Sequence, residues 1–380
     1  MKIATAIAYL AAMVAFSNAQ QVGTLTPEIH PSLPSQTCTA SGCTTQNTKI
    51  VLDSNWRWLH NVGGSTNCYT GNTWNSNYCP DPATFAANCA VDGADYSGTY
   101  GIAASGNGVS IKLVTKGPYS INIGSRIYLL EDDNTYKIYK LLNQEFTFDV
   151  DKWTRMVASP SMASPSKTNK AGAAYGTGYC DAQCPHDIKF INGEANVKNW
   201  VPSSVDPNAG FGQYGTCCTE LDIWESNSIS QAYTTHPCTV KGQTRCSSPT
   251  ECGDDDTGNR YTGVCDKDGC DFNPYRYNSH NFYGPGSSFS VDSTKPVTAV
   301  TQFITDDNTA NGNLVQVKRF YVQNGVAIDN APISWSGIDP LNYLTDPVCD
   351  QAKTLFGDKN DHKPRAGSRR WVTLSREVLF

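Results

Sequence analysis

The chain has 380 residues, enough for one large domain or two ordinary ones, and its composition excludes several classes of protein. Only 17% of the residues are charged and the net charge is −6, which disfavours a nucleic-acid binder, a long-helix protein or a disordered chain. The chain is instead rich in glycine (31), tyrosine (19), cysteine (15) and tryptophan (8), a composition that favours a β-rich protein with neutral polar ligands.

The first residues predict secretion. Lys2 is followed by an apolar run over residues 3–16 and by a small-x-small cleavage site at residues 17–19. We therefore expect residues 1–19 to be a signal peptide and the mature chain to be a soluble extracellular protein without a membrane span. Fifteen cysteines in a secreted chain favour disulfides over zinc, and the odd count leaves at least one cysteine unpaired.

Short β-branched or aromatic stretches, separated by Gly, Asn and Asp clusters, predict the strands of an antiparallel sandwich. In chain order these stretches are residues 109–114, 126–130, 145–150 and 297–303. Helix signals are nearly absent. The connections over residues 52–110 and 192–282 are long for a compact fold, and we expect the cysteines within them to tie them down.

Two segments differ in composition from the rest of the chain. Residues 152–170 contain four basic residues, no acidic ones and many Ser and Pro. Residues 363–380 are similarly basic, with Glu377 as their only acid. The simplest interpretation is a linker and a tail.

The candidate catalytic side chains are concentrated in residues 217–227, Cys-Cys-Thr-Glu-Leu-Asp-Ile-Trp-Glu-Ser-Asn. On a strand, Glu220, Asp222 and Trp224 share one face because side chains alternate, whereas Glu225 would point toward the core. Burying a carboxylate is costly, so we expect a bulge near Trp224 that turns Glu225 to join the other two acids.

Three interpretations of this acidic face remain open. It is a solvated strand face, a cation site built from oxygen ligands such as calcium prefers, or a catalytic pair for glycoside hydrolysis. Hydrolysis with retention needs two carboxyl groups about 5–5.5 Å apart. Flat tryptophan faces favour a sugar ligand, although each ring also fits a place in the core. The tryptophans considered are Trp56, Trp58, Trp74, Trp200 and Trp224.

The sequence also resembles the fungal family-seven glycoside hydrolases, which are reducing-end cellobiohydrolases and related endoglucanases. The stretches that carry the resemblance are VLDSNWRWLH (51–60), TNCYTGNTWN (66–75), YGTGYCDAQCPHDIKFINGEANV (175–197), CCTELDIWESNSIS (217–230), HPC (236–238), CDKDGCDFNPYR (265–276) and FYGPGSSFSVD (282–292). The resemblance covers about residues 20–151 and 168–362.

This resemblance implies an all-β, concanavalin-like jelly-roll sandwich of two antiparallel sheets over residues 20–362. Long disulfide-tied loops would roof a tunnel for one cellulose chain. It assigns Glu220 as nucleophile, Asp222 as its hydrogen-bonding helper and Glu225 as general acid/base. The implied substrate contacts are Trp56, Trp58, Tyr179, Asp181, Gln183, His236, Arg260 and Asp268.

The implied activity is hydrolysis of the β-1,4-glucosidic bonds of cellulose by a monomeric, secreted enzyme without metal or cofactor. Residues 200–214 and 238–265 are long, as in the tunnel-roofing loops of cellobiohydrolases. This favours processive release of cellobiose, with an endoglucanase of the same family as the alternative. A non-catalytic, lectin-like sandwich and a folding-deficient product are the rivals from other classes.

The resemblance further implies seven disulfides. They join Cys38 to Cys43, Cys68 to Cys89, Cys180 to Cys218, Cys184 to Cys217, Cys238 to Cys265, Cys246 to Cys252 and Cys270 to Cys349. Cys79 is left over because Phe85 stands where its partner would be. Another family disulfide is missing at both ends, where Gly23 and Ala90 stand instead.

The two basic segments are where the chain departs from the family. Residues 152–167 replace a family strand, and residues 363–380 stand where further core strands would follow. Both segments resemble frame shifts or misread introns. We expect the missing strands to leave unpaired sheet edges and this chain to have weak activity or none.

The run of three aspartates at residues 254–256 lacks the spacing of a calcium loop and is expected to be a solvated turn.

Overall fold

The structure is a computed structural model. The residues that it describes are 20–78, 80–118, 120–151, 155–158, 170–255, 259–358 and 378–379. Of residues 155–158 and 378–379 only the backbone is described. The expected signal peptide, the leftover Cys79 and most of the two basic segments therefore lie outside the described residues.

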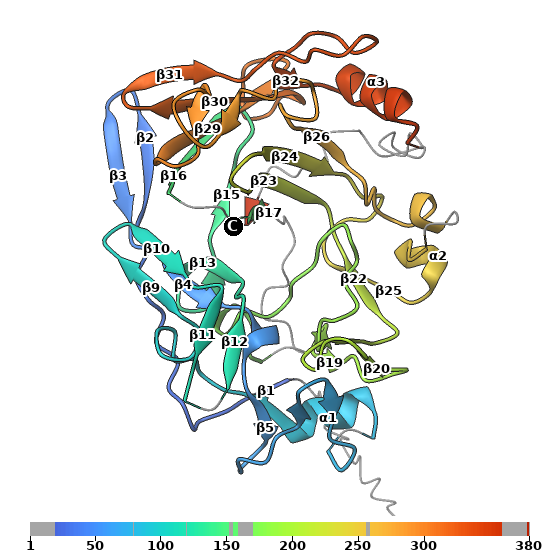
Figure 1. Ribbon diagram of the computed structural model, residues 1–380. Helices are drawn as coiled ribbons and strands as arrows, with labels where there is room; N and C mark the ends of the chain where they lie inside the picture. Colours follow the sequence, from blue (N-terminus) through green and yellow to red (C-terminus); the bar gives the residue numbers. More distant parts are fainter. Residues whose placement is uncertain are drawn as a thin grey trace, which may run out of the picture.

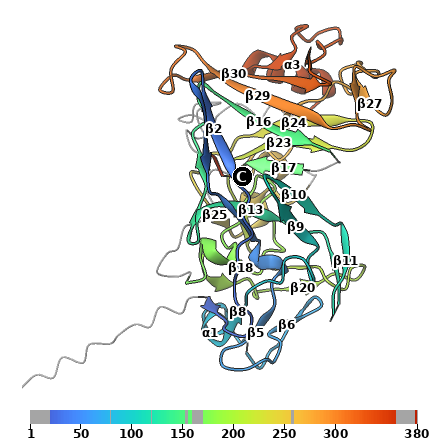
Figure 2. The same cartoon turned by 90° about the vertical axis from the view of Figure 1, so that its left-hand side faces the viewer.

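Two antiparallel sheets stack on each other in the upper half of the molecule (Figures 1 and 2). The outer sheet contains β16 (Gln144–Val150), β29 (Val297–Thr305), β30 (Leu314–Gln323), β31 (Val326–Asp329) and β32 (Tyr343–Leu344). The inner sheet contains β17 (Arg155–Ala158), β23 (Glu220–Ser226), β24 (Gln231–His236) and β26 (Cys270–Phe272). The expected all-β sandwich is confirmed.

The main hydrophobic core lies between these two sheets. The inner sheet contributes side chains such as Leu221, Tyr233 and Phe272, and the outer sheet contributes Val317 and Tyr321, all at most 1% exposed. Alternating burial along β30 leaves the other side chains of that strand outside the core. Period-two alternation therefore sets which face of each sheet is apolar, as the sequence pattern predicts.

Smaller sheets and two-stranded ribbons make up the rest of the described chain, many of them in the lower half of the molecule (Figure 1). One sheet contains β4 (Lys49–Leu52), β13 (Ile127–Asp132) and β14 (Thr135–Tyr136), and another contains β1 (Gln21–Val22), β5 (Leu59–Asn61) and β8 (Cys89–Val91). The two-stranded ribbons are β2–β3 (Ser35–Thr39, Gly42–Gln46), β6–β7 (Tyr69–Thr70, Thr73–Trp74), β9–β10 (Ile102–Ser105, Gly108–Ile111), β11–β12 (Val114–Lys116, Ile121–Ile123), β15–β33 (Ile138–Tyr139, Val378–Leu379), β18–β19 (Phe190–Ile191, Glu194–Ala195), β20–β21 (Val201–Pro202, Gly210–Phe211), β22–β25 (Gly215–Cys217, Thr244–Cys246) and β27–β28 (Tyr283–Gly284, Val291–Asp292).

The helices of the described residues are short. The α-helices are α1 (Pro82–Asn88), α2 (Pro249–Cys252) and α3 (Asp346–Phe356), and the 3₁₀ helices are η1 (Ser54–Trp56), η2 (Ala173–Tyr175) and η3 (Asn259–Tyr261). The longest, α3, begins at its capping residue Thr345, whose hydroxyl accepts a hydrogen bond from the Val348 amide, and ends at Gly357 in the left-handed region. None of these helices is long and apolar enough to cross a lipid bilayer.

The expectation of unpaired sheet edges does not hold at β23. The backbone of residues 155–158, within the first basic segment, forms β17 and pairs with β23 in antiparallel register. Backbone amides and carbonyls pair whatever side chains they carry, so a short β-compatible run is enough to cover the edge. Residues 378–379 of the tail likewise pair with β15 as the short strand β33.

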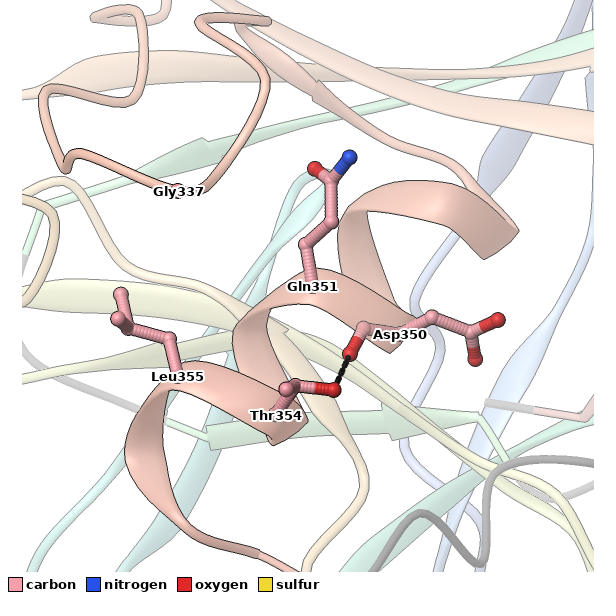
Figure 3. Close-up of a pocket in the computed structure, with 5 residues that line it drawn as sticks. All are labelled: Gly337, Asp350, Gln351, Thr354 and Leu355. Carbon is pink, nitrogen blue, oxygen red and sulfur yellow. Dashed lines mark hydrogen bonds between the residues drawn. The ribbon is translucent and has the colours of Figure 1, made fainter.

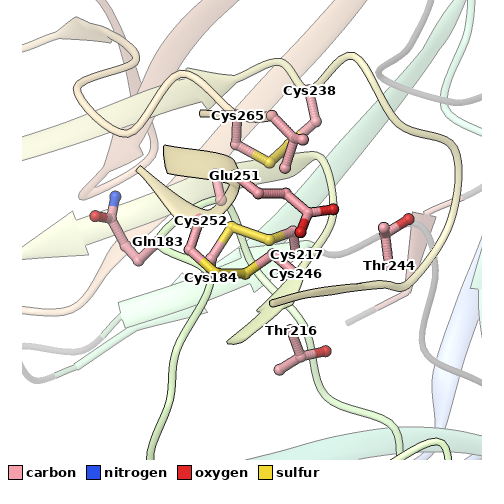
Figure 4. The surroundings of a disulfide bond; sticks show 12 residues. Gln183, Cys184, Thr216, Cys217, Cys238, Thr244, Cys246, Glu251, Cys252 and Cys265 are labelled. Atoms are coloured by element: carbon pink, nitrogen blue, oxygen red, sulfur yellow. A yellow bond between two sulfur atoms is a disulfide. The ribbon is translucent and has the colours of Figure 1, made fainter. Parts of the chain in front are cut away.

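Seven disulfides are present, at the same seven cysteine pairs that the family resemblance implies. Three of them, joining Cys184 to Cys217, Cys246 to Cys252 and Cys238 to Cys265, lie together beside the ribbon β22–β25 (Figure 4). Of the seven disulfides, Cys180–Cys218 and Cys184–Cys217 hold the chain in place immediately before β23. The long connection over residues 192–282 is therefore tied down by cysteines, as expected, just before the acidic strand.

Removing the Cys184–Cys217 disulfide should cost more stability than removing Cys38–Cys43. The sequence separations are 33 and 5 residues, and a longer closed loop restricts the unfolded chain more. We expect the double alanine variants to lose about 3–4 and about 2 kcal/mol of unfolding free energy, respectively. Urea titrations of the two variants measure this, and equal losses would contradict the expectation.

Candidate active site

The acidic strand β23 contains a bulge. On β24, Thr234 pairs with Asp222 and Ala232 pairs with Glu225, so that Ile223 and Trp224 together face the single residue between them. The extra residue reverses the alternation after Asp222. This is the bulge that the cost of burying Glu225 predicts.

The three carboxylates consequently share one face of the strand. Asp222 and Thr234 are direct cross-strand partners, so their side chains point to the same side of the sheet. The Thr234 hydroxyl donates to Oε2 of Glu225 at 3.4 Å, which places Glu225 on that side as well. Glu220 pairs with His236 two residues earlier in the same register.

Trp224 does not share this face, and the sequence expectation for it is wrong. Its ring is fully buried in the core between the sheets, in edge contact with Phe148, Tyr283 and Tyr321. The bulge is the reason, because the inserted residue turns Trp224 inward when it turns Glu225 outward.

Glu220 and Asp222 are both buried, at 0% and 1% exposure, whereas Glu225 is half-buried. Oε2 of Glu220 accepts a hydrogen bond from the Ala182 amide at 3.0 Å. Oδ2 of Asp222 lies 3.2 Å from Nε2 of His236, and one ligand atom from each of Glu220, Asp222 and His236 falls within 4.8 Å of the others. Glu220 and its expected helper Asp222 are therefore the two carboxylates that lie together, next to His236.

His236 carries a positive charge between two of these acids. Desolvation lowers its pKa, but the hydrogen bond to Asp222 and the charges of Glu220 and Asp222 outweigh it and raise the pKa of His236 to about 9. Its Nδ1 lies 2.9 Å from the carbonyl oxygen of Asp266, which fixes the ring. The imidazolium therefore offsets part of the repulsion between the carboxylates at neutral pH.

We expect the stabilisation from His236 to be lost as the pH rises. The folded-state pKa of about 9 lies above the ordinary 6.5, so the contribution is complete below pH 6.5 and disappears as the pH rises through 9. Melting temperatures of the native chain should therefore fall more steeply over this range than those of His236→Asn. Proton NMR that shows His236 titrating below pH 7 would contradict this.

The predicted contacts Tyr179, Asp181 and Gln183 lie beside the carboxylates. The Tyr179 hydroxyl donates to Asp181 at 2.6 Å, and the amide of the intervening Ala182 is the donor to Glu220. The Gln183 side chain donates to the carbonyl oxygen of Lys267 at 2.7 Å.

Arg260 and Asp268 lie on the His236 side. Arg260 donates to Asp268 through Nε at 2.8 Å and through Nη2 at 2.5 Å. Asp268 is two residues after Asp266, which contacts His236. The structure thus places Asp268, and Arg260 with it, next to the segment whose residues Asp266 and Gly269 lie against the ring of His236.

Trp56 and Trp58 are both half-buried, on either side of the buried Arg57. The Trp56 indole donates to the carbonyl oxygen of Ile123 at 3.2 Å, and the Trp58 indole donates to Asn67 at 2.7 Å. By contrast, Trp74 and Trp200 pack edge-on against each other in an aromatic cluster that includes Phe85. Their rings serve packing in this cluster.

Sequence reasoning missed Arg126, which joins Trp56 to the rest of the site. Its guanidinium lies 3.2 Å from the ring centre of Tyr179 and 5.3 Å from that of Trp56, and it donates to Asp53 at 2.8 Å. Lys189 was also missed; desolvation lowers its pKa to about 8, and its amine donates to the carbonyl oxygen of Asn55 at 2.6 Å. Arg126 lies outside the stretches that carry the family resemblance, and Lys189 lies within one of them but was not singled out; each meets its partners only through the fold.

The calcium interpretation does not suit this site. Calcium takes six to eight oxygen ligands, whereas the clustered donors of the described residues are two carboxylates and an imidazole. Cys180 and Cys184 are both in disulfides, which agrees with the expectation that the cysteines form disulfides and do not bind zinc.

A groove of about 390 Å³ lies elsewhere, on the outer side of α3 (Figure 3). The described residues that line it are Gly337, Asp350, Gln351, Thr354 and Leu355, none of which is a predicted site residue. Its side chains carry no arrangement that would bind or cleave a sugar.

An all-β jelly roll with three carboxylates on one inner strand, flanked by aromatic and polar side chains, has the architecture of a glycoside hydrolase. Residues 22–377 match the sequence model of glycosyl hydrolase family 7, a range that includes the first basic segment and ends within the second. The cellobiohydrolase of this family from Daphnia pulex is 51% identical and superposes with a TM-score of 0.91 over 94% of this chain and 84% of that chain.

Two further solved structures are similar. A cellobiohydrolase from Melanocarpus albomyces in complex with cellotetraose is 37% identical, with a TM-score of 0.84 over 94% of this chain and 84% of that chain. The native endocellulase of Humicola insolens is 33% identical, with a TM-score of 0.75 over 94% of this chain and 85% of that chain. The chain belongs to glycosyl hydrolase family 7, and the resemblance seen in its motifs is confirmed.

Proposed function

We propose that this chain is a secreted, monomeric cellulase that cleaves β-1,4-glucosidic bonds with retention of configuration and releases cellobiose from chain ends. Membership of glycosyl hydrolase family 7 makes it a glycosidase that acts on cellulose. The observation that carries the proposed mechanism is the bulge in β23, which gives Glu220, Asp222 and Glu225 a common face.

In the first step, Glu225 donates its proton to the glycosidic oxygen while a carboxylate oxygen of Glu220 attacks the anomeric carbon. The bond to the leaving sugar breaks and a covalent glycosyl ester on Glu220 forms. In the second step, Glu225 takes a proton from water, the water oxygen attacks the same carbon, and Glu220 leaves. Two inversions give net retention.

The environments of the two carboxyl groups suit these roles. Glu220 is buried and oriented by the Ala182 amide, as a nucleophile with a fixed direction of attack requires. Glu225 is half-buried, so water can reach it in the second step. Asp222, held by His236, is the helper that orients Glu220.

We assign the aromatic and polar neighbours to sugar binding. Trp56 and Trp58 would stack on glucose rings on the glycone side, since indole faces pack against the C–H faces of sugars. Tyr179, Asp181 and Gln183 would contact the sugar near the cleaved bond. His236 would contact it beside Glu225, and Arg260 and Asp268 would contact it on the product side. Burial of the polar groups among fixed partners favours binding to a single orientation of the chain.

Exo action is favoured over endo action by the loops at residues 200–214 and 238–265. Disulfides close the second loop at both Cys238–Cys265 and Cys246–Cys252. A tied loop can cover a bound chain without a large loss of entropy on closure. The 51% identity to a cellobiohydrolase, against 33% to an endocellulase, points the same way.

A product profile on amorphous cellulose tests the mode of action. We expect cellobiose as the main soluble product, with few new reducing ends left in the insoluble fraction. A rapid fall in viscosity with new reducing ends in the insoluble fraction would instead establish the endoglucanase alternative. Cellulose binding without any product would favour the lectin-like alternative.

The expectation of weak activity rested on the family strands and sugar-holding groups that both basic segments replace. β17 pairs with β23 and covers one of the edges concerned. For the groups expected after residue 362, weak activity stays a prediction. Extracellular location is supported by the amino-terminal apolar run and by seven disulfides, which persist in oxidising compartments.

A further inference from the structure

The bulge in β23 leaves one residue out of register on both sides of the strand. On the β24 side, the paired residues on β23 pass from Asp222 directly to Glu225. On the β17 side, they pass from Asp222 to Trp224, so that Ile223 is skipped by both neighbours. A bulge disrupts the ladder locally, and the backbone groups that it releases need other partners.

Arg319 on β30 supplies such a partner from the opposite sheet. Its side chain is 0% exposed and crosses the core, where Nη2 donates a short hydrogen bond to the carbonyl oxygen of Ile223. Its Nε donates to the Thr301 hydroxyl on β29 at 2.9 Å, which fixes the guanidinium from the other side.

The same guanidinium also contacts the two rings that define the bulge. It lies 5.5 Å from the ring centre of Trp224, the residue that the bulge turns inward, and 4.7 Å from that of Tyr233, the residue opposite the bulge. Arg319 therefore touches the bulge at its released carbonyl and at both flanking rings. These contacts combine a charge-assisted hydrogen bond with cation–π attraction.

A charged group in this place is expensive for a protein core. Among the described residues its hydrogen-bond partners are neutral oxygens, and no carboxylate forms an ion pair with it. Desolvation lowers the pKa of Arg319, which reflects the cost of burying the charge. An apolar side chain would fill the same space more favourably, so the core alone does not account for an arginine.

We propose that Arg319 is a positioning residue that holds the bulge of β23 and thereby aims Glu225 at the bond that is cleaved; this inference rests on the proposed function. Without the contacts of Arg319, the residues after Asp222 are free to return to regular alternation. Regular alternation would turn Glu225 toward the core. Glu220 precedes the bulge and is held by the Ala182 amide, so its position does not depend on Arg319.

The proposal predicts a selective loss of acid assistance. In Arg319→Met, kcat/KM for phenyl β-cellobioside, whose leaving group needs a proton, should fall by about 100-fold, as for a displacement of about 1 Å. For 2,4-dinitrophenyl β-cellobioside, whose leaving group needs none, kcat/KM should change by less than about threefold. Loss of the buried charge raises the thermal midpoint and loss of the hydrogen bond to Ile223 lowers it, so the difference between the two substrates, and not the midpoint, decides the role of Arg319.

The neighbouring Lys318→Met is the matched control, since Lys318 lies on the same strand and pairs with Asp329 on the outside at 3.8 Å. Lys318→Met should leave kcat/KM for both substrates unchanged. Arg319→Lys keeps the charge without the planar fork and should show an intermediate selective loss; it also decides the question if Arg319→Met fails to fold.

Equal losses on both substrates, or no loss in an active protein, would overturn the role of Arg319. If the unmodified chain hydrolyses neither substrate, the proposed function fails first, and the assignment to Arg319 fails with it. The two failures are distinguished by the activity of the unmodified chain.

Discussion

Replacing Glu220 by glutamine should reduce hydrolysis of cellulose and of aryl cellobiosides by about 10,000-fold or more, because the amide cannot form the glycosyl ester. Glutamine keeps the size of the side chain and can still meet the Ala182 amide through its carbonyl oxygen. The fold and the affinity for cellulose should therefore be nearly unchanged. Initial rates and a pull-down on insoluble cellulose measure the two effects.

The matched control is Glu194→Gln. Glu194 lies on β19 with its side chain 47% exposed, paired with Arg245 at 2.9 Å, away from the acidic face. It should retain the activity of the unmodified chain. If Glu220→Gln still hydrolyses cellulose at a comparable rate, Glu220 is not the nucleophile; if neither protein hydrolyses but both bind, the chain is a sugar-binding sandwich.

Replacing Glu225 by glutamine should produce a different kinetic pattern. Removal of a general acid typically costs about 100- to 10,000-fold, and we expect that range for substrates with poor leaving groups. With a dinitrophenyl leaving group the first step should survive, so that the glycosyl ester accumulates because no base activates water. A burst of dinitrophenol followed by slow turnover is the expected signature.

A small anion such as azide should restore turnover in the Glu225 variant and yield the β-configured glycosyl azide, since it needs no general base. The result that would contradict the assignment is an equal loss on all leaving groups without a burst. In Glu220→Ala, whose shorter side chain leaves room for the anion, azide rescue that gives the α-configured product would support the separate roles of the two residues.

The strands that could be predicted are those with strong local alternation. Residues 145–150 and 297–303 were expected as strands and correspond to β16 and β29, whereas the single stretch expected over residues 109–114 is divided between β10 and β11. The break falls at Lys112 and Leu113, where the chain leaves one ribbon for the next. Local pattern indicates a strand but not where its partner ends.

The helix α3 was missed although its signals are in the sequence. Thr345, followed by Asp346 and Pro347, is a helix start, and Gly357 is a helix stop. The helical repeat of apolar residues in α3 is hard to recognise because many of the surrounding residues are polar. The seven disulfide pairs, in contrast, were implied by family resemblance, because spacing alone leaves many pairings open.

The part of the site that could be predicted is the part that depends on a single strand, β23. The bulge follows from the cost of burying Glu225, but the inward turn of Trp224 follows from the same bulge and was not foreseen. Arg126 and Arg319 were beyond sequence reasoning, since their partners come from strands distant in the chain. Those contacts exist only once the sheets have stacked.

The most direct test of the mechanism is to trap the covalent intermediate with a 2-deoxy-2-fluoro cellobioside that carries a good leaving group, and to locate the label by peptide mass spectrometry. The account predicts one sugar per chain on the peptide that contains Glu220, and a β-anomer as the first product released from untreated substrate. A label on any other residue, or an α-anomer released first, would contradict it.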